Sequence, residues 1–127
     1  MALTEGKYTA EFLVSEANGT LSRDNATITV AASTKLSPGH VLAKLSATGK
    51  YVEYDNAGTD GSQIAAGILY EEADNSAVGS PADFDGVVIN LDAEVVAADL
   101  SLFSGASAGD KTAAYADLLA LGEKSVE

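Results

Sequence analysis

The residue types that could do chemistry begin with His40, the single histidine of the chain. An imidazole acts as a general base or as a ligand only when partners stand beside it, and His40 follows directly on a Pro38-Gly39 turn. A Ser-His-Asp triad would have to use this one residue, since the sequence has no second imidazole. We therefore expect His40 to be a surface or strand-edge residue, and we assign no catalytic residue.

The loop Asp55–Gly61 (DNAGTDG) superficially resembles a calcium loop. An EF-hand needs oxygen ligands at alternating positions and a glutamate at the twelfth. Counted from Asp55, the third position is Ala57 and the twelfth is Ala66, and neither offers a side-chain oxygen. The sequence instead predicts a tight loop built on Asx turns and glycine, with no metal site.

Two further candidate sites, a carboxylate pair for acid–base catalysis and a phosphate-binding loop, are also excluded. The carboxylates of Glu71, Glu72 and Asp74 follow an apolar run and enter a polar segment, where solvation removes the pKa difference that acid–base catalysis needs. Gly105, Gly109 and Lys111 lack the Gly-x-x-x-x-Gly-Lys spacing of a phosphate-binding loop. We expect no cofactor.

Charge is the sharpest property of the whole chain. Its 127 residues carry 19 acidic and seven basic side chains, for a net charge of −12. Such a chain repels phosphate backbones and anionic membrane surfaces, so neither nucleic acid nor a membrane is an expected partner.

Cysteine is absent, which excludes disulfides and thiolate zinc sites. Residues 1–7 lack the pattern of a signal peptide, and no apolar run approaches a membrane span.

The elements that would position these residues are mostly short strands. Apolar residues alternate with polar ones at several places, and glycine-marked turns separate the runs. Pro38-Gly39 fits the centre of a type II turn, and Gly67 suggests a bulge or a close backbone approach. The expected strands are Tyr8–Val14, Ala26–Val30, Val41–Leu45, Tyr51–Tyr54, Gln63–Tyr70, Val87–Leu91 and Glu94–Ala98.

One helix is expected, over Lys111–Leu121, with Asp110 as its N-cap and Gly122 as its C-cap. Its apolar stripe is Ala114, Tyr115, Leu118, Leu119 and Leu121. The segment Glu71–Asp83 is expected to be a surface loop. Strands and helices do not alternate along the chain, so we predict a mainly β, mainly antiparallel fold with one C-terminal helix.

The alternating segment Tyr8–Val14 stands apart from the later strands, beyond a long polar stretch. Periodicity alone is compatible with an ordinary first strand of the core, and it slightly favours that interpretation. The segment could also be an arm that adds a strand to another chain's sheet. 

Several stretches together resemble the head decoration protein D family of tailed phages. They are FLVSEANGTLSRD at 12–24, SPGHVLAKLSATGKYVEYDNAGTDGSQIAAGILY at 37–70, VVINLDAEVVAADL at 87–100 and KTAAYADLLALG at 111–122. Their order along the chain is more specific than any one of them, and together they cover most of the sequence.

This resemblance implies a β-clip or β-tulip fold, with residues 1–25 as an N-terminal arm and linker and 26–127 as the compact domain. It implies a structural protein, not an enzyme, that forms a homotrimer on the outer surface of an expanded phage head. There it would bridge subunits of the major capsid protein after synthesis in the host cytoplasm. The arm would add a strand to the capsid protein through Tyr8, Ala10, Phe12 and Val14, and it tends to be disordered in the free protein.

Two other function classes were weighed against capsid decoration. A small β-clip module that binds a carbohydrate or another small ligand is the alternative, although the chain has few aromatic residues for stacking on a sugar. An enzyme ranks last because no nucleophile, base or metal cluster is convincing. For the decoration function, the Pro38-Gly39 turn and the Asp55–Gly61 loop are expected near subunit junctions.

Overall fold

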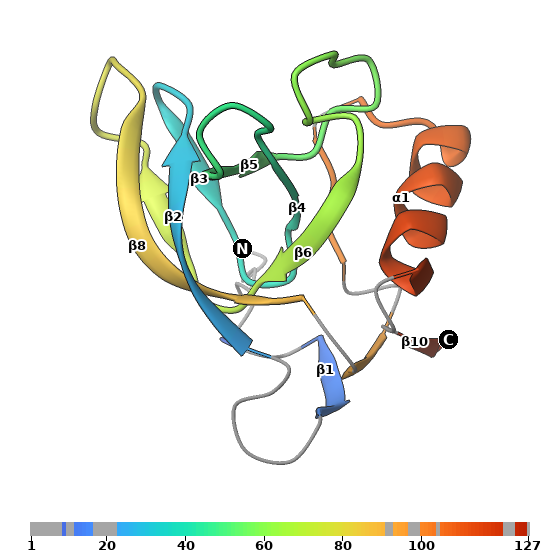
Figure 1. Cartoon of the computed structure of the whole chain (residues 1–127). Coiled ribbons are helices and arrows are strands. Elements are labelled where there is room, and N and C mark those ends of the chain that lie inside the picture. Colours follow the sequence, from blue (N-terminus) through green and yellow to red (C-terminus); the bar gives the residue numbers. More distant parts are fainter. Residues whose placement is uncertain are drawn as a thin grey trace, which may run out of the picture.

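A closed barrel of five strands forms the centre of the molecule (Figure 1). The computed structural model describes residues 9, 12–16, 23–90, 93–96, 100–103, 105–120 and 124–126. Around the barrel the strand order is β2-β5-β4-β6-β8. These strands are β2 (Arg23–Val30), β4 (Val41–Lys44), β5 (Tyr51–Glu53), β6 (Ala65–Leu69) and β8 (Ala82–Ile89).

Two smaller sheets and one helix accompany the barrel. A three-stranded sheet has the order β1-β9-β10, with β1 (Leu13–Glu16), β9 (Ala93–Val96) and β10 (Lys124–Val126). Strands β3 (Thr34–Leu36) and β7 (Ala73–Asn75) pair with each other. The helix α1 (Ala108–Ala120) packs beside β6, on one side of the barrel in Figure 1. The predicted fold class, mainly β with one C-terminal helix, is confirmed.

The barrel interior is one of two hydrophobic cores. Strand β2 shows how the sequence builds it, because Ile28 and Val30 are buried in the interior while Thr27 and Thr29 alternate with them along the strand. The residues of this core come from β2, β3, β4, β5, β6, β7 and β8: Ile28, Val30, Leu36, Leu42, Tyr51, Leu69, Ala73 and Val88.

The second core, the outer core, lies between the outer face of the barrel and the surrounding elements. It gathers Phe12, Val41, Ala43, Tyr54, Ala65, Ile68, Ile89, Val95, Leu100, Ala114 and Leu118. Strands β4 and β6 contribute to both cores, so they are buried on both faces. This explains why their sequences are nearly continuous apolar runs and do not alternate.

Gly67 on β6 has the close approach that the sequence suggested. A Cβ atom at this position would lie 2.8 Å from Val88 Cγ1 and 3.3 Å from the Ile89 carbonyl oxygen. The register between β4 and β6 also shifts here, since Leu42 pairs with Gly67 but Ala43 pairs with Ala65. The prediction for Gly67 is confirmed.

The barrel closes between β2 and β5 through a single registered pair, Ile28 with Tyr51, and the two strands are parallel. Side chains reinforce this seam from outside. Lys50 Nζ donates to Asp83 Oδ2 at 2.6 Å, and Thr29 Oγ1 donates to Asp83 Oδ1 at 2.7 Å. One carboxylate therefore links the start of β5 with β2 and β8.

The expectation that Glu71–Asp83 is a surface loop is wrong in two places. Ala73–Asn75 forms β7, which pairs antiparallel with β3, and β8 already begins at Ala82. The side chain of Asn75 is only 1% exposed, and its amide nitrogen donates to the carbonyls of Val30, Ala31 and Ser80. A buried polar residue of this kind leaves no apolar period in the sequence, because its burial depends on distant carbonyls.

The helix begins earlier than predicted. Ser107, not Asp110, is the N-cap: its Oγ accepts from the Asp110 backbone N–H at 3.2 Å, and Asp110 Oδ2 accepts from the Ser107 N–H at 2.9 Å. This is a reciprocal capping box with an aspartate in the third position. Ala114 and Leu118 are buried as expected, but Leu119 is 64% exposed. Leu121 and Gly122 lie outside the described residues.

Candidate interaction surfaces

The N-terminal segment packs on its own chain from Phe12 onward. Phe12 is 1% exposed within the outer core, in the same cluster as Val95 and Leu118. Strand β1 then pairs antiparallel with β9, from Leu13 with Val95 to Glu16 with Ala93. Because the sheet order is β1-β9-β10, β1 forms one edge of that sheet.

Of the four predicted arm residues, Tyr8 and Ala10 lie outside the described residues, and Val14 lies within β1. The docking role of the four therefore stays a prediction, as does the division of the chain at residue 25. Phe12 belongs at present to an intramolecular contact. Any role of Phe12 on a partner must compete with this contact.

The Pro38-Gly39 turn is a buried junction within the chain. Gly39 has φ of +89°, and the His40 N–H donates to the Ser37 carbonyl at 3.2 Å, as a type II turn requires. Gly39 also bonds to two distant segments, donating to the Leu69 carbonyl and accepting from Ser101. The turn thus fixes the start of β4 against β6.

The loop Asp55–Gly61 is closed by its own side chains, as predicted. Asp55 Oδ1 accepts from the Ala57 N–H, and Asp60 Oδ1 accepts from both the N–H and the hydroxyl of Ser62. The Ser62 hydrogen bonds lower the pKa of Asp60. In these Asx turns the carboxylates of Asp55 and Asp60 accept hydrogen bonds from the loop itself.

The same loop is tied to the start of α1. The Tyr54 hydroxyl donates to Asn56 Oδ1, and Asn56 Nδ2 donates to Asp110 Oδ1, each at 3.0 Å. Burial raises the pKa of Tyr54, and the nearby carboxylates of Asp117 and Asp110 add to this effect. The phenol therefore stays a neutral donor in this link.

His40 is buried, so the expected surface position is wrong. The residue lies directly before β4 and forms an isolated β-bridge with Ser101. Its side chain is 9% exposed, and Nε2 lies 2.8 Å from Glu53 Oε2. The contact has the separation of an ion pair, but its geometry is not that of a hydrogen bond. The histidine's backbone links β6 to this region, since the Leu69 N–H donates to the His40 carbonyl. Sequence spacing gave no signal for the contact with Glu53.

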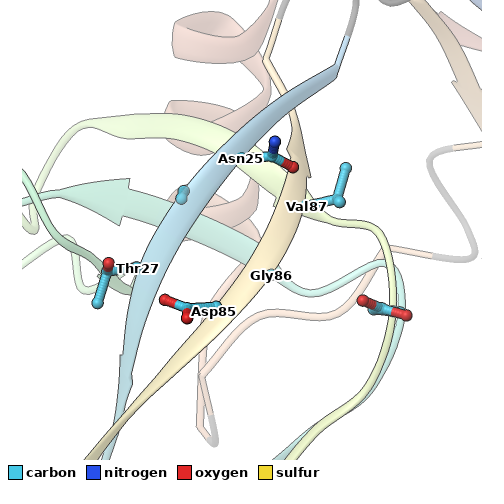
Figure 2. A pocket seen from close by; sticks show the side chains of 7 residues that line it. Asn25, Thr27, Asp85, Gly86 and Val87 are labelled. Carbon is cyan, nitrogen blue, oxygen red and sulfur yellow. The ribbon is translucent and has the colours of Figure 1, made fainter.

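One hollow of about 370 Å³ lies along the outer surface of β2 and β8 (Figure 2). Asn25 and Thr27 of β2 stand opposite Val87 and Asp85 of β8 in the strand register. Glu71 completes the wall. The hollow is open, and the residues of its two carboxylates, Glu71 and Asp85, are exposed. It supplies no nucleophile and no buried acid or base.

Ser107 is the central residue of a Gly-x-Ser-x-Gly pattern, since Gly105–Gly109 reads GASAG. A nucleophile elbow places the serine between a strand and a helix. Here the described residues directly before it, 100–103 and 105–106, contain only an isolated bridge at Ser101, and the hydroxyl caps α1. The pattern is therefore a helix start.

Within the part of the chain that the structure describes, no group of three His, Cys, Asp or Glu side chains is placed to hold a metal ion. No described helix is long and apolar enough to cross a membrane.

The sequence matches a known family along nearly the whole chain. The model of the bacteriophage lambda head decoration protein D family matches residues 2–123. The chain belongs to this family. No curated protein matches the sequence.

Membership fixes the class of function. Head decoration proteins are structural proteins of the phage capsid and not enzymes, so this chain is associated with the head of a virion. The absence of a catalytic constellation in the sequence is consistent with that class. The relevant sites on this molecule are therefore surfaces that meet other proteins.

Proposed function

We propose that this chain covers the outer surface of an expanded phage head as a homotrimer and stabilises it by bridging major capsid protein subunits. The family match over residues 2–123 is the observation that carries this proposal. Bridging by three copies turns individually weak contacts into a strong attachment. The net charge of −12 suits a protein that is made in the host cytoplasm and must not be retained by DNA.

The arm is proposed to supply one contact, with Tyr8, Ala10, Phe12 and Val14 adding a strand to the capsid protein. Strand β1 supports this because it is the edge of a sheet, and sheet edges accept further strands. A capsid strand against this edge would leave Phe12 in its own core. Docking of Phe12 itself would instead require β1 to leave β9.

The direct test is a chain that lacks residues 1–11 and keeps Phe12 and β1. We expect it to bind expanded heads at least about tenfold more weakly, because the proposed contacts of Tyr8 and Ala10 are gone. Circular dichroism would check that the fold is intact. Saturation of the heads at the full-length concentration would refute the role of the arm.

A matched pair of variants separates the two faces of the arm. Replacing Tyr8 and Ala10 with serine should weaken head binding, whereas Thr9→Ser with Glu11→Gln should not, because these two residues lie on the opposite face of an extended strand.

Native mass spectrometry tests the assembly independently. We expect three copies of the 12.9 kDa chain, and a monomer at micromolar concentration would contradict the trimer.

A further inference from the structure

An apolar slot of about 250 Å³ opens at the seam of the barrel. Pairing between β2 and β5 stops after Ile28 and Tyr51, and the next residues along both strands form the walls of the slot. The lining includes Ala31, Thr34, Leu36, Val52, Glu53 and Pro81. The volume suits one long side chain and not a whole helix or a folded ligand.

Glu53 is the only charged residue in this lining. Its side chain is 38% exposed, and one carboxylate oxygen meets the buried Nε2 of His40 at 2.8 Å. His40 Nε2 makes no hydrogen bond. His40 is not among the lining residues, and its contact uses only Oε2 of Glu53, so Oε1 keeps its acceptor capacity.

The chemistry of the slot selects among occupants. A purely apolar side chain would cover Oε1 of Glu53 without giving this oxygen a hydrogen-bond donor, which is unfavourable. An anionic group would meet Glu53 on a chain of net charge −12. A metal ion needs several oxygen ligands, and the slot has one carboxylate.

We propose that this slot receives one lysine or arginine side chain from the surface of the protein partner that the chain decorates. The methylene stem would pack on Leu36, Val52 and Pro81 while the cation meets Glu53, as long basic side chains do at partly apolar surfaces. This inference rests on the proposed function for the identity of the partner.

The slot itself is tested without any partner, by following backbone amide NMR signals of the full chain during titration. The probes are n-butylammonium, n-butylguanidinium and the neutral 1-pentanol. Both cations should shift the signals of Thr34, Val52 and Glu53 at lower concentration than the alcohol does. Equal response to the alcohol, or no response at these residues, overturns the proposal.

Two variants and one control make the titration specific. Glu53→Gln should weaken cation binding by about fivefold, the upper range for a partly exposed ion pair. Glu71→Gln removes the same charge at another exposed site and should bind like the parent chain. Ala31→Leu at the exposed rim should fill the slot and block both the cations and the alcohol. If Glu53→Gln binds the cations like the parent chain, the assigned role of Glu53 is wrong.

Binding to expanded heads that lack decoration protein then tests the partner. Glu53→Gln should bind more weakly than Glu71→Gln, with melting temperatures measured for both. If the parent chain binds heads and Glu53→Gln binds equally well, this inference fails while the proposed function stands. If the parent chain does not bind heads, the proposed function fails, and with it the partner named here.

Discussion

At the scale of single residues, Phe12 joins the N-terminal segment to elements from the far end of the chain. Its side chain fills the outer core beside Ala114 and Leu118. We expect Phe12→Ala to lower the free energy of unfolding by about 3–5 kcal/mol, because the truncation leaves a cavity in a packed core. Urea unfolding measures this, with Leu119→Ala as an exposed control that should change stability by less than about 0.5 kcal/mol. Similar values for the two variants would show that Phe12 is not a core residue.

Gly67 offers a second prediction at this scale. Alanine there would bring its Cβ within 2.8 Å of Val88 and close to the Ile89 backbone, so the strands must shift. We expect Gly67→Ala to lower the free energy of unfolding by about 1–3 kcal/mol. Gly79→Ala is the control, because no atom lies within 4 Å of its Cβ position. Thermal unfolding of both variants measures the difference. A Gly67→Ala chain as stable as the parent chain would contradict the close approach of β6 to Val88.

At the scale of single elements, the start of α1 is stabilised by a reciprocal cap. Ser107 and Asp110 cap each other's backbone N–H groups, so removing the serine hydroxyl exposes an unpaired donor. Ser107→Ala should lower the free energy of unfolding by about 1 kcal/mol. Hydrogen exchange should also speed up in the first turn of the helix. Ser80→Ala, at an exposed serine outside any helix, should have neither effect.

The sequence predicted elements well where a local period exists. Strands β2, β4, β5 and β6 appear where apolar runs and glycine turns placed them, because alternation and turn chemistry are properties of neighbouring residues. Strands β3 and β7 were missed because each has three residues and depends on the other. The long polar N-terminal half of β8 was also missed, since its pairing partner is β2 and not a neighbour in sequence.

The candidate surfaces were predicted less completely than the elements. The Asx turns of Asp55 and Asp60 are local and were correct. The contact of His40 with Glu53 follows from the register of β4 and β5, in which Leu42 pairs with Glu53. The slot arises where β2 and β5 close the barrel. This closure joins residues that are far apart in the sequence, so no spacing rule predicts the slot.

At the scale of the whole molecule, acid should weaken the fold through its exposed carboxylates. Hydrogen bonds from Lys50 and Thr29 lower the pKa of Asp83 from its ordinary value of 3.8, and Ser76 and Ser107 act similarly on Asp74 and Asp110. A pKa lowered in the folded state contributes stability above the unfolded value. That stability is lost as the pH falls through the folded value.

We therefore expect the melting temperature to fall as the pH drops below about 4, and Asp83→Asn to lose part of that dependence. Differential scanning calorimetry between pH 7 and pH 2.5 measures both chains. The difference in melting temperature between the parent chain and Asp83→Asn should become smaller toward pH 2.5. A gap that stays constant over this range would show that Asp83 does not stabilise the seam through its charge.

The packing of Phe12 has a consequence for how the protein is made. Its core partner Leu118 is encoded about a hundred residues later, which corresponds to roughly 5–20 s of translation. Throughout that interval Phe12 lacks the part of its core that α1 supplies. The outer core is thus completed only near the end of synthesis, and truncated chains without α1 would leave Phe12 incompletely buried.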